Sequence, residues 1–213
     1  MGSLSHARIG TDESGKGDYF GYLVVAAVFV DDAMESALED LRVRDSKRVS
    51  DRPAARLAGE IQRLCPHAVV RISPGKYNEL HAKMRNLNRL LAWAHARAIE
   101  DVLARRPCRL VIADQFGDGA HLKSALMAKG RQVQLVQMPR AEADVAVAAA
   151  SIVARAVFLD TLQRLSDQVG VPLPKGAVHV VEAAREVVAK GGREALAKVA
   201  KLHFKTTRQV LGQ

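Results

Sequence analysis

The chain has 213 residues, and its 32 lysines and arginines outnumber its 23 aspartates and glutamates, giving a formal net charge of +9 and an isoelectric point of about 9.9. This length fits one large domain or two small ones and is enough to bury a substantial core. The basic surplus favours polyanionic partners, nucleic acid before anionic membranes. It is spread along the chain, which argues against a disordered basic tail.

The cysteines and the N-terminal residues indicate the cellular compartment in which we expect the protein. Cys65 and Cys108 stand alone without a CxxC spacing, which predicts buried free thiols in an intracellular protein. The first residues lack the apolar region of a signal peptide, and no apolar run reaches the length of a membrane span. We therefore expect a cytoplasmic monomer with no membrane partner.

The first third of the chain predicts two strands, at residues 7–11 and 21–30, joined by a glycine-rich turn. The second strand is apolar on both faces, which predicts an interior position in its sheet. Charged and apolar residues then alternate at helical spacing over 33–42 and 51–64, and residues 67–72 predict a third strand.

The remaining elements are expected in the following order: a helix at 86–105, a strand at 109–113, a strand at 132–138, a buried alanine-rich helix at 143–165, and helices near 178–190 and 193–203 separated by two glycines. Early hairpins and later crossovers predict an α/β fold with a five-stranded mixed sheet covered by helices on both faces. We expect one domain over 1–213, in which residues from about 170 form a helical C-terminal extension.

Two adjacent carboxylates, Asp12 and Glu13, end the first strand and lead into the glycine-rich turn. Adjacent carboxylates repel, and burial raises their pKa unless a cation neutralises them. Hard oxygen ligands select Mg²⁺ or Mn²⁺. The nearby backbone of Gly15, Lys16 and Gly17 is open to a phosphate or sugar. Taken alone, the stretch fits metal-assisted chemistry on a phosphodiester and an ordinary acidic turn equally well.

Further carboxylates stand at other strand ends. Asp114 ends the fourth strand, and Glu142 and Asp144 precede the buried helix. A mixed sheet can bring Asp12, Glu13, Asp114 and one of these two to the same edge, the pattern of a site for two hard cations about 4 Å apart. Because adjacent strand residues point to opposite faces, Asp12 and Glu13 share a site only if the strand bends there.

Residues 12–21, Asp-Glu-Ser-Gly-Lys-Gly-Asp-Tyr-Phe-Gly, resemble the signature of prokaryotic type 2 ribonucleases H, and the Gly-Lys-Gly form resembles that of ribonucleases HIII. The resemblance spans most of the chain. It continues in residues 44–47, 76–80, 86–88, 92–98, 114–116, 140–142, 148–155, 174–177 and 201–207.

The resemblance implies an endonuclease that cuts the RNA strand of RNA–DNA hybrids with Mg²⁺ or Mn²⁺ and leaves 5′-phosphate and 3′-hydroxyl ends. The carboxylates that match the family's catalytic and metal-binding residues are Asp12, Glu13, Asp114 and Glu142. It implies that Asp114 and Glu142 hold the metal that orders the attacking water, and that Asp12 is shared between the metals. The Arg-Ala-Glu match favours Glu142 over Asp144 as the fourth ligand.

The resemblance also implies how substrate is bound. The backbone of Gly15, Lys16 and Gly17 would contact the ribose 2′-hydroxyl, the group that distinguishes RNA from DNA. Ser46 and Lys47 would hold a backbone phosphate. Ribonucleases HIII typically carry an N-terminal substrate-binding domain, whereas only a short segment precedes Asp12 here, so we expect the core's own basic surface to bind the hybrid.

Two other functions fit parts of the sequence. A ribonuclease HII-type enzyme would cut at single embedded ribonucleotides, but Gly-Lys-Gly and the Asp-Gln-Phe at 114–116 argue against it. A protein that binds nucleic acid without cutting it would not need all four carboxylates.

The family turn usually reads Phe-Gly-Pro, whereas Gly21 precedes Tyr22 here. Without proline's fixed φ, the entry into the second strand is expected to be looser. His95 is expected to pack in the core.

Overall fold

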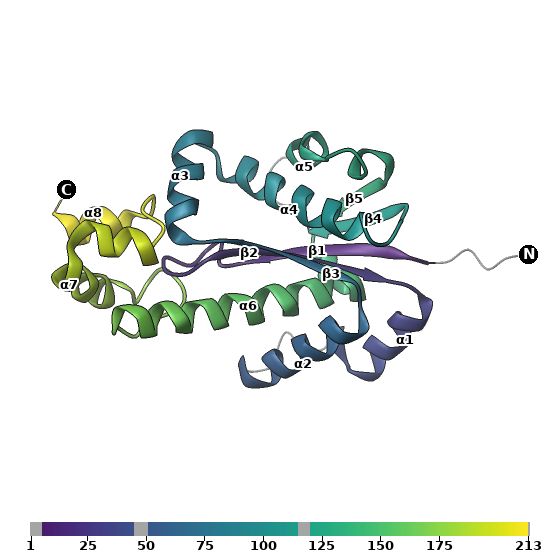
Figure 1. Cartoon of the computed structure of the whole chain (residues 1–213), viewed down its shortest axis with the longest axis horizontal. Helices are drawn as coiled ribbons and strands as arrows, with labels where there is room; N and C mark the ends of the chain where they lie inside the picture. Colours follow the sequence, from purple (N-terminus) through teal and green to yellow (C-terminus); the bar gives the residue numbers. More distant parts are fainter. Residues whose placement is uncertain (1–5, 45–50, 115–119, 213) are drawn as a thin grey trace, which may run out of the picture. The chain divides into compact units, whose positions relative to one another are not determined.

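The computed structural model describes residues 6–44, 51–114 and 120–212 (Figure 1). Ser46 and Lys47 lie outside the described residues. Five strands form a sheet in the order β3-β2-β1-β4-β5. The strands are β1 (Arg8–Ser14), β2 (Leu23–Val30), β3 (His67–Ile72), β4 (Leu110–Asp114) and β5 (Gln134–Met138).

More residues lie in helices than in strands. The helices are α1 (Asp32–Asp40), α2 (Asp51–Leu64), α3 (Pro74–Met84), α4 (Leu87–Leu103), α5 (Ala120–Ala125), α6 (Val145–Val169), α7 (Val181–Val199) and α8 (Lys205–Leu211), with short 3₁₀ helices η2 (Gly130–Gln132) and η3 (Ala141–Ala143). β1 pairs in parallel with β4, and β4 with β5. The predicted α/β fold with a mixed five-stranded sheet and flanking helices is confirmed.

The chain forms two compact units. The first contains Met1–Glu13, Val25–Val70 and Asn86–Ala156, and the second contains Ser14–Val24, Arg71–Arg85 and Val157–Gln213. The expectation of one domain with a helical C-terminal extension stays a prediction.

Within the first unit, helices cover both faces of the sheet. Figure 1 shows α4 and α5 on one side, and α1, α2 and the start of α6 on the other. All eight residues of β2 are buried, as expected for an interior strand. The close approach of α6 is visible at Gly10 of β1, where a Cβ would lie 2.1 Å from the carbonyl carbon of Ala146.

Several helices and strands begin and end where the sequence predicts, and others do not. The helix at 51–64 and the strand at 67–72 are found where they were predicted. α7 is interrupted by the non-helical backbone of Gly191 and Gly192, which confirms the predicted break. The predicted helix over 193–203 ends at Val199, however, because the next residue pairs with the second unit's Phe20 in an antiparallel bridge.

Two helices of the second unit were not predicted. α3 begins with Pro74 at its first turn, and the Ser73 hydroxyl accepts a hydrogen bond from the Lys76 N–H. Its apolar stripe is weak, so capping and packing of Tyr77 decide its structure more than periodicity does. α8 is only seven residues long, which is too short for a periodic pattern to show.

α6 corrects one expectation about apolar segments. By length and composition it is apolar enough to cross a membrane, although 61% of its most apolar window is buried inside the protein. Core helices of soluble proteins meet the same criteria, and the buried share agrees with the predicted buried helix. Cys65 is a buried free thiol, as expected, whereas Cys108 is only partly buried.

The contact at Gly10 yields a stability prediction. Gly10→Ala should lower the free energy of unfolding by about 1–3 kcal/mol, because the added methyl forces the backbone of α6 away from β1. Gly59→Ala is the matched control, since a Cβ at this position in α2 meets no atom within 4 Å and alanine favours helix. Urea unfolding of both variants measures the difference, and equal stabilities would contradict the close α6–β1 contact.

Candidate active site

β1 directs successive side chains to opposite faces of the sheet as it approaches the acidic pair. Gly10 faces α6, as described above. Thr11 faces α4, because its hydroxyl donates to the carbonyl of Ala26 at 2.9 Å and lies 2.9 Å from Nδ1 of His95. Asp12 and Glu13 continue this alternation.

Asp12 lies on the α6 side, where its carboxylate forms a hydrogen bond with the side chain of Ser151. The Glu13 N–H also donates to Asp12 Oδ1 at 2.8 Å. Burial, and secondarily the negative charge of Glu13, raise the pKa of Asp12 to about 6, although both hydrogen bonds act to lower it. A cation bound here would offset both effects, because its positive charge favours the ionised carboxylate.

Glu13 lies on the α4 side, with its Oε2 3.1 Å from Nε2 of His95. His95 is fully buried, as predicted, and links Thr11 to Glu13 through its two ring nitrogens. Because the Thr11 hydroxyl donates to Ala26, His95 Nδ1 donates to Thr11, and Nε2 donates to Glu13 only if the ring is doubly protonated. β1 continues to Ser14 without the bend that would turn Asp12 and Glu13 to one side.

Asp114 is placed beside Asp12 by strand pairing. Thr11 pairs with Ala113 in parallel register, so Asp12 and Asp114 are the next residues on two neighbouring strands. Asp114 Oδ1 accepts a hydrogen bond from the Ala141 N–H at 3.4 Å. Ala141 begins η3, whose second residue is Glu142, so this contact brings Asp114 close to the segment that carries Glu142.

A small pocket in the first unit lies between Glu142 and residues of α6. Its described lining consists of Val43, Arg44, Glu142, Ala148, Ser151, Ile152 and Arg155. Glu142 and Ser151, which contacts Asp12, therefore line the same pocket. Arg155, which also lines this pocket, pairs with Asp51 at 2.8 Å. Ser151 and Arg155 were not predicted as site residues, although both lie in the 148–155 segment that resembles the family.

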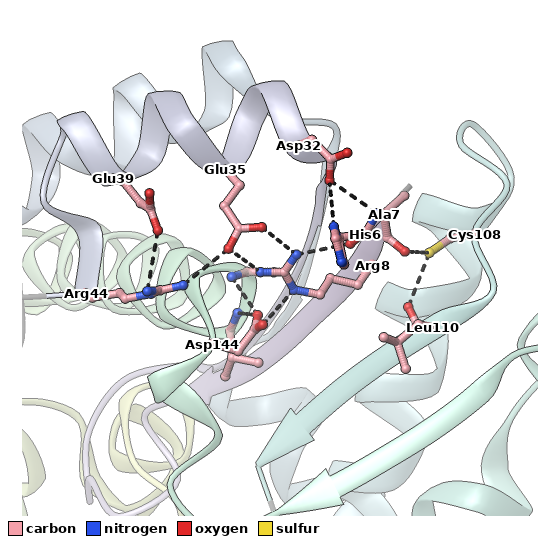
Figure 2. A network of polar contacts seen from close by, with 12 residues as sticks. His6, Ala7, Arg8, Asp32, Glu35, Glu39, Arg44, Cys108, Leu110 and Asp144 are labelled. Carbon is pink, nitrogen blue, oxygen red and sulfur yellow. Dashed lines mark hydrogen bonds and ion pairs between the residues drawn. The ribbon is translucent and has the colours of Figure 1, made fainter. Parts of the chain in front are cut away.

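Asp144, the alternative to Glu142, has a different environment, shown in Figure 2. Its Oδ2 accepts from Nε of Arg8 at 2.6 Å, and its Oδ1 accepts from the Ala146 N–H at 2.8 Å at the start of α6. Arg8 is only 7% exposed and also binds Glu35 through both terminal nitrogens. Asp144 thus caps α6 and neutralises a buried arginine.

The carboxylates suit a divalent cation chemically, but the described residues do not form a complete metal site. No group of three or more His, Cys, Asp and Glu among them has an arrangement that could hold a metal ion. The donors on the α6 side, Asp12, Asp114 and Glu142, are all oxygens, which Mg²⁺ and Mn²⁺ prefer. The raised pKa of Asp12 is the structural observation that fits a cation here.

The glycine-rich turn belongs to the second unit. Gly15 has a φ of +86°, and a Cβ there would lie 2.1 Å from the carbonyl oxygen of Tyr22, so only glycine fits. Gly17, in contrast, is exposed, and a Cβ there would meet no atom within 4 Å. The Asp18 N–H donates to the Gly15 carbonyl at 3.4 Å and closes the turn. The backbone at Gly17 is therefore open to a ligand.

Comparison with known proteins defines the class. The family model for ribonuclease HII matches residues 9–207, and the chain belongs to this family. The ribonuclease HIII of Protochlamydia amoebophila (strain UWE25) is 47% identical over 207 residues, which cover 97% of this chain and 69% of the relative. That of Chlamydia pneumoniae is 48% identical over 208 residues, covering 95% of this chain and 70% of the relative.

Solved structures agree. Bst-RNase HIII in complex with Mn²⁺ superposes with a TM-score of 0.89 at 37% identity, covering 97% of this chain and 69% of that chain. The ribonuclease H2 of Pyrococcus horikoshii OT3 has a TM-score of 0.83 at 20% identity, covers 97% of each chain and shows the fold alone. The predicted resemblance is thus confirmed, and the protein is a ribonuclease H that is similar to the ribonucleases HIII named above.

Proposed function

We propose that this ribonuclease H is an endonuclease that cuts the RNA strand of RNA–DNA hybrids with two Mg²⁺ or Mn²⁺ ions, leaving 5′-phosphate and 3′-hydroxyl ends. The observation that carries the proposal is that Asp12 and Asp114 are the next residues on paired strands, with Glu142 in the adjoining η3 and in the pocket that Ser151 lines. The Mn²⁺ bound to Bst-RNase HIII supports the choice of metal.

Each carboxylate of the proposed metal site has its own proposed role. Asp114 and Glu142 would hold the ion that orders the attacking water, and Asp12 would be shared between the two ions. Ions bound there would supply Lewis acidity and a more acidic water. Ser151 orients the carboxylate of Asp12. Glu13 completes the proposed set, and since His95 holds it on the α4 side, its participation requires β1 to bend when metal binds.

Glu142 is the better candidate than Asp144 for the fourth carboxylate. Glu142 lines the pocket that contains Ser151, whereas Asp144 is engaged by Arg8 and by the first N–H groups of α6. Removing Asp144 from those contacts would leave a buried guanidinium with fewer partners, which is unfavourable.

Substrate binding is proposed at two places. The backbone of Gly15, Lys16 and Gly17 would contact a ribose 2′-hydroxyl, and the open backbone at Gly17 supports this. Ser46 and Lys47 would bind a phosphate. This is supported by Arg44, which lies two residues before Ser46 and lines the same pocket as Glu142. We further propose a cytoplasmic monomer with no membrane partner, in keeping with the free Cys65 thiol.

The first prediction concerns metal. Chelation with EDTA should abolish cleavage, and Mg²⁺ or Mn²⁺ should restore it. Asp12→Asn and Asp114→Asn should each lower kcat by about 100-fold or more, because each removes a charged ligand of a shared site. Asp101→Asn, which alters an aspartate paired with Arg97 on α4, is the control and should retain activity. Full activity in Asp12→Asn would contradict the assignment.

The second prediction separates Glu142 from Asp144. Glu142→Gln should lower kcat by about 100-fold or more with little change in stability. Asp144→Asn should lower the free energy of unfolding by about 1–3 kcal/mol, because it removes one charge from the buried pair with Arg8. Cleavage rates and urea unfolding should be measured on both. An inactive but fully stable Asp144→Asn would show that the ligand is Asp144.

The third prediction concerns the substrate. A hybrid with a continuous RNA strand should be cut efficiently, whereas a DNA duplex with one embedded ribonucleotide should be cut poorly. The Gly-Lys-Gly turn and the ribonuclease HIII relatives motivate this expectation. Cleavage of both duplexes at equal enzyme concentration is the measurement. Efficient cutting beside the lone ribonucleotide would instead indicate a ribonuclease HII-type activity.

A further inference from the structure

A buried lysine holds the backbone that follows the glycine-rich turn. Lys201 is fully buried in the second unit. Its Nζ donates to the carbonyls of Asp18 at 2.9 Å, Gly21 at 2.8 Å and Phe20 at 3.4 Å. An ammonium group has three N–H donors, so this set of carbonyls can use all of them.

The ammonium group of Lys201 is buried, which affects both its pKa and its need for hydrogen-bond partners. Burial lowers the pKa of Lys201 to about 7, and the nearby Asp18 acts in the opposite direction. A buried cation is retained only where it is well hydrogen-bonded. Removing its donors would leave three carbonyls of one short loop without these partners, which loosens the loop.

Lys201 is itself fixed from two sides. Its backbone N–H donates to the Tyr19 carbonyl at 2.8 Å, and Ala200 pairs with Phe20 in an antiparallel bridge. Asn78 of α3 holds the same segment, since its Nδ2 donates to the Ala200 carbonyl at 3.0 Å and its Oδ1 accepts from the Leu202 N–H at 2.9 Å.

A third segment binds the same loop. The Gly176 N–H donates to Asp18 Oδ1 at 2.6 Å, and the Tyr19 N–H donates to the Gly176 carbonyl at 2.8 Å. Residues 174–177 and 201–207 therefore contact residues 18–21 directly, and residues 76–80 support the same loop through Ala200 and Leu202. These segments carry the family resemblance but none of the proposed catalytic groups. Asp18 also closes the turn that begins at Gly15. One of the three carbonyls that Lys201 binds therefore belongs to the last residue of that turn.

We propose that Lys201 is a positioning residue that fixes the backbone of residues 15–18 for recognition of the ribose 2′-hydroxyl, and so determines selectivity for RNA. This role rests on the proposed function of the Gly-Lys-Gly turn. Lys201 acts through the turn and contacts no substrate itself, so its loss should affect recognition more than the chemical step.

The test compares Lys201→Met with Lys198→Met. Both remove one positive charge from nearby positions of the chain, but Lys198 is exposed. The substrates are a hybrid with a continuous RNA strand and a series of hybrids with a single 2′-deoxy substitution at successive positions. In Lys201→Met we expect KM to rise about tenfold, kcat to change less than about threefold, and the 2′-deoxy penalty to shrink about tenfold. Lys198→Met should behave like the wild type.

Hydrogen exchange gives a readout independent of activity. Amides of residues 15–21 should exchange faster in Lys201→Met than in Lys198→Met. Should Lys201→Met not fold, Asn78→Asp provides the second variant, because it keeps the acceptor for Leu202 but loses the donor to Ala200. The same shrinkage of the 2′-deoxy penalty is expected in it.

The outcomes separate the two proposals. A wild-type enzyme indifferent to every 2′-deoxy substitution would overturn recognition by the turn, and the role of Lys201 with it. A wild-type penalty that persists unchanged in a folded Lys201→Met, with unchanged KM, would overturn the role of Lys201 alone.

Discussion

The carboxylate site depends on how closely α6 packs against β1. At Gly10 there is no room for a side chain between the strand and the backbone of Ala146. Five residues further along α6, or about 7.5 Å, Ser151 contacts Asp12, which lies two residues further along β1, or about 6.6 Å. The two advances match, so helix and strand run side by side from Gly10 to Asp12. A larger residue at position 10 would therefore move Ser151 away from Asp12.

A second contact fixes the start of α6. Arg8, at the beginning of β1, binds Asp144 before the first turn of the helix and Glu35 on α1. Because Arg8 is almost fully buried, its charge must be neutralised there, and Asp144 does this while capping α6. Glu142, two residues before Asp144, is held in place as a consequence. A structural carboxylate and a proposed catalytic one thus lie two residues apart for different physical reasons.

Sequence reasoning was most informative where the answer depended on strand ends and on the two-residue period of a strand. A mixed sheet can place two strand ends side by side, which is why Asp12 and Asp114 were expected at one edge, and the pairing of β1 with β4 agrees with this expectation. The period of two also indicated that Asp12 and Glu13 would face opposite sides, and their contacts with Ser151 and His95 agree. Whether Glu13 joins the metal site remains a prediction.

Other features of the structure depend on contacts between residues that lie far apart in the sequence, which a local sequence pattern does not reveal. Ser151 and His95 lie on helices far from β1 in sequence, and each reads locally as an ordinary helix residue. The predicted helix over 193–203 ended early because the Lys201 backbone pairs with Tyr19 instead. A buried lysine is rare enough that sequence alone would place Lys201 at the surface. In each case a tertiary hydrogen bond outweighed the local preference.

The signature at 12–18 is held by two separate sets of contacts. Asp12 and Glu13 belong to the first unit and are held by Ser151 and His95, whereas the turn that begins after Ser14 belongs to the second unit and is held through Lys201. The two sets share no side chain. The acidic pair and the turn therefore have independent supports within residues 12–18. As proposed, support of the turn accounts for the family resemblance in segments such as 76–80 and 201–207, which carry no carboxylate of the proposed site.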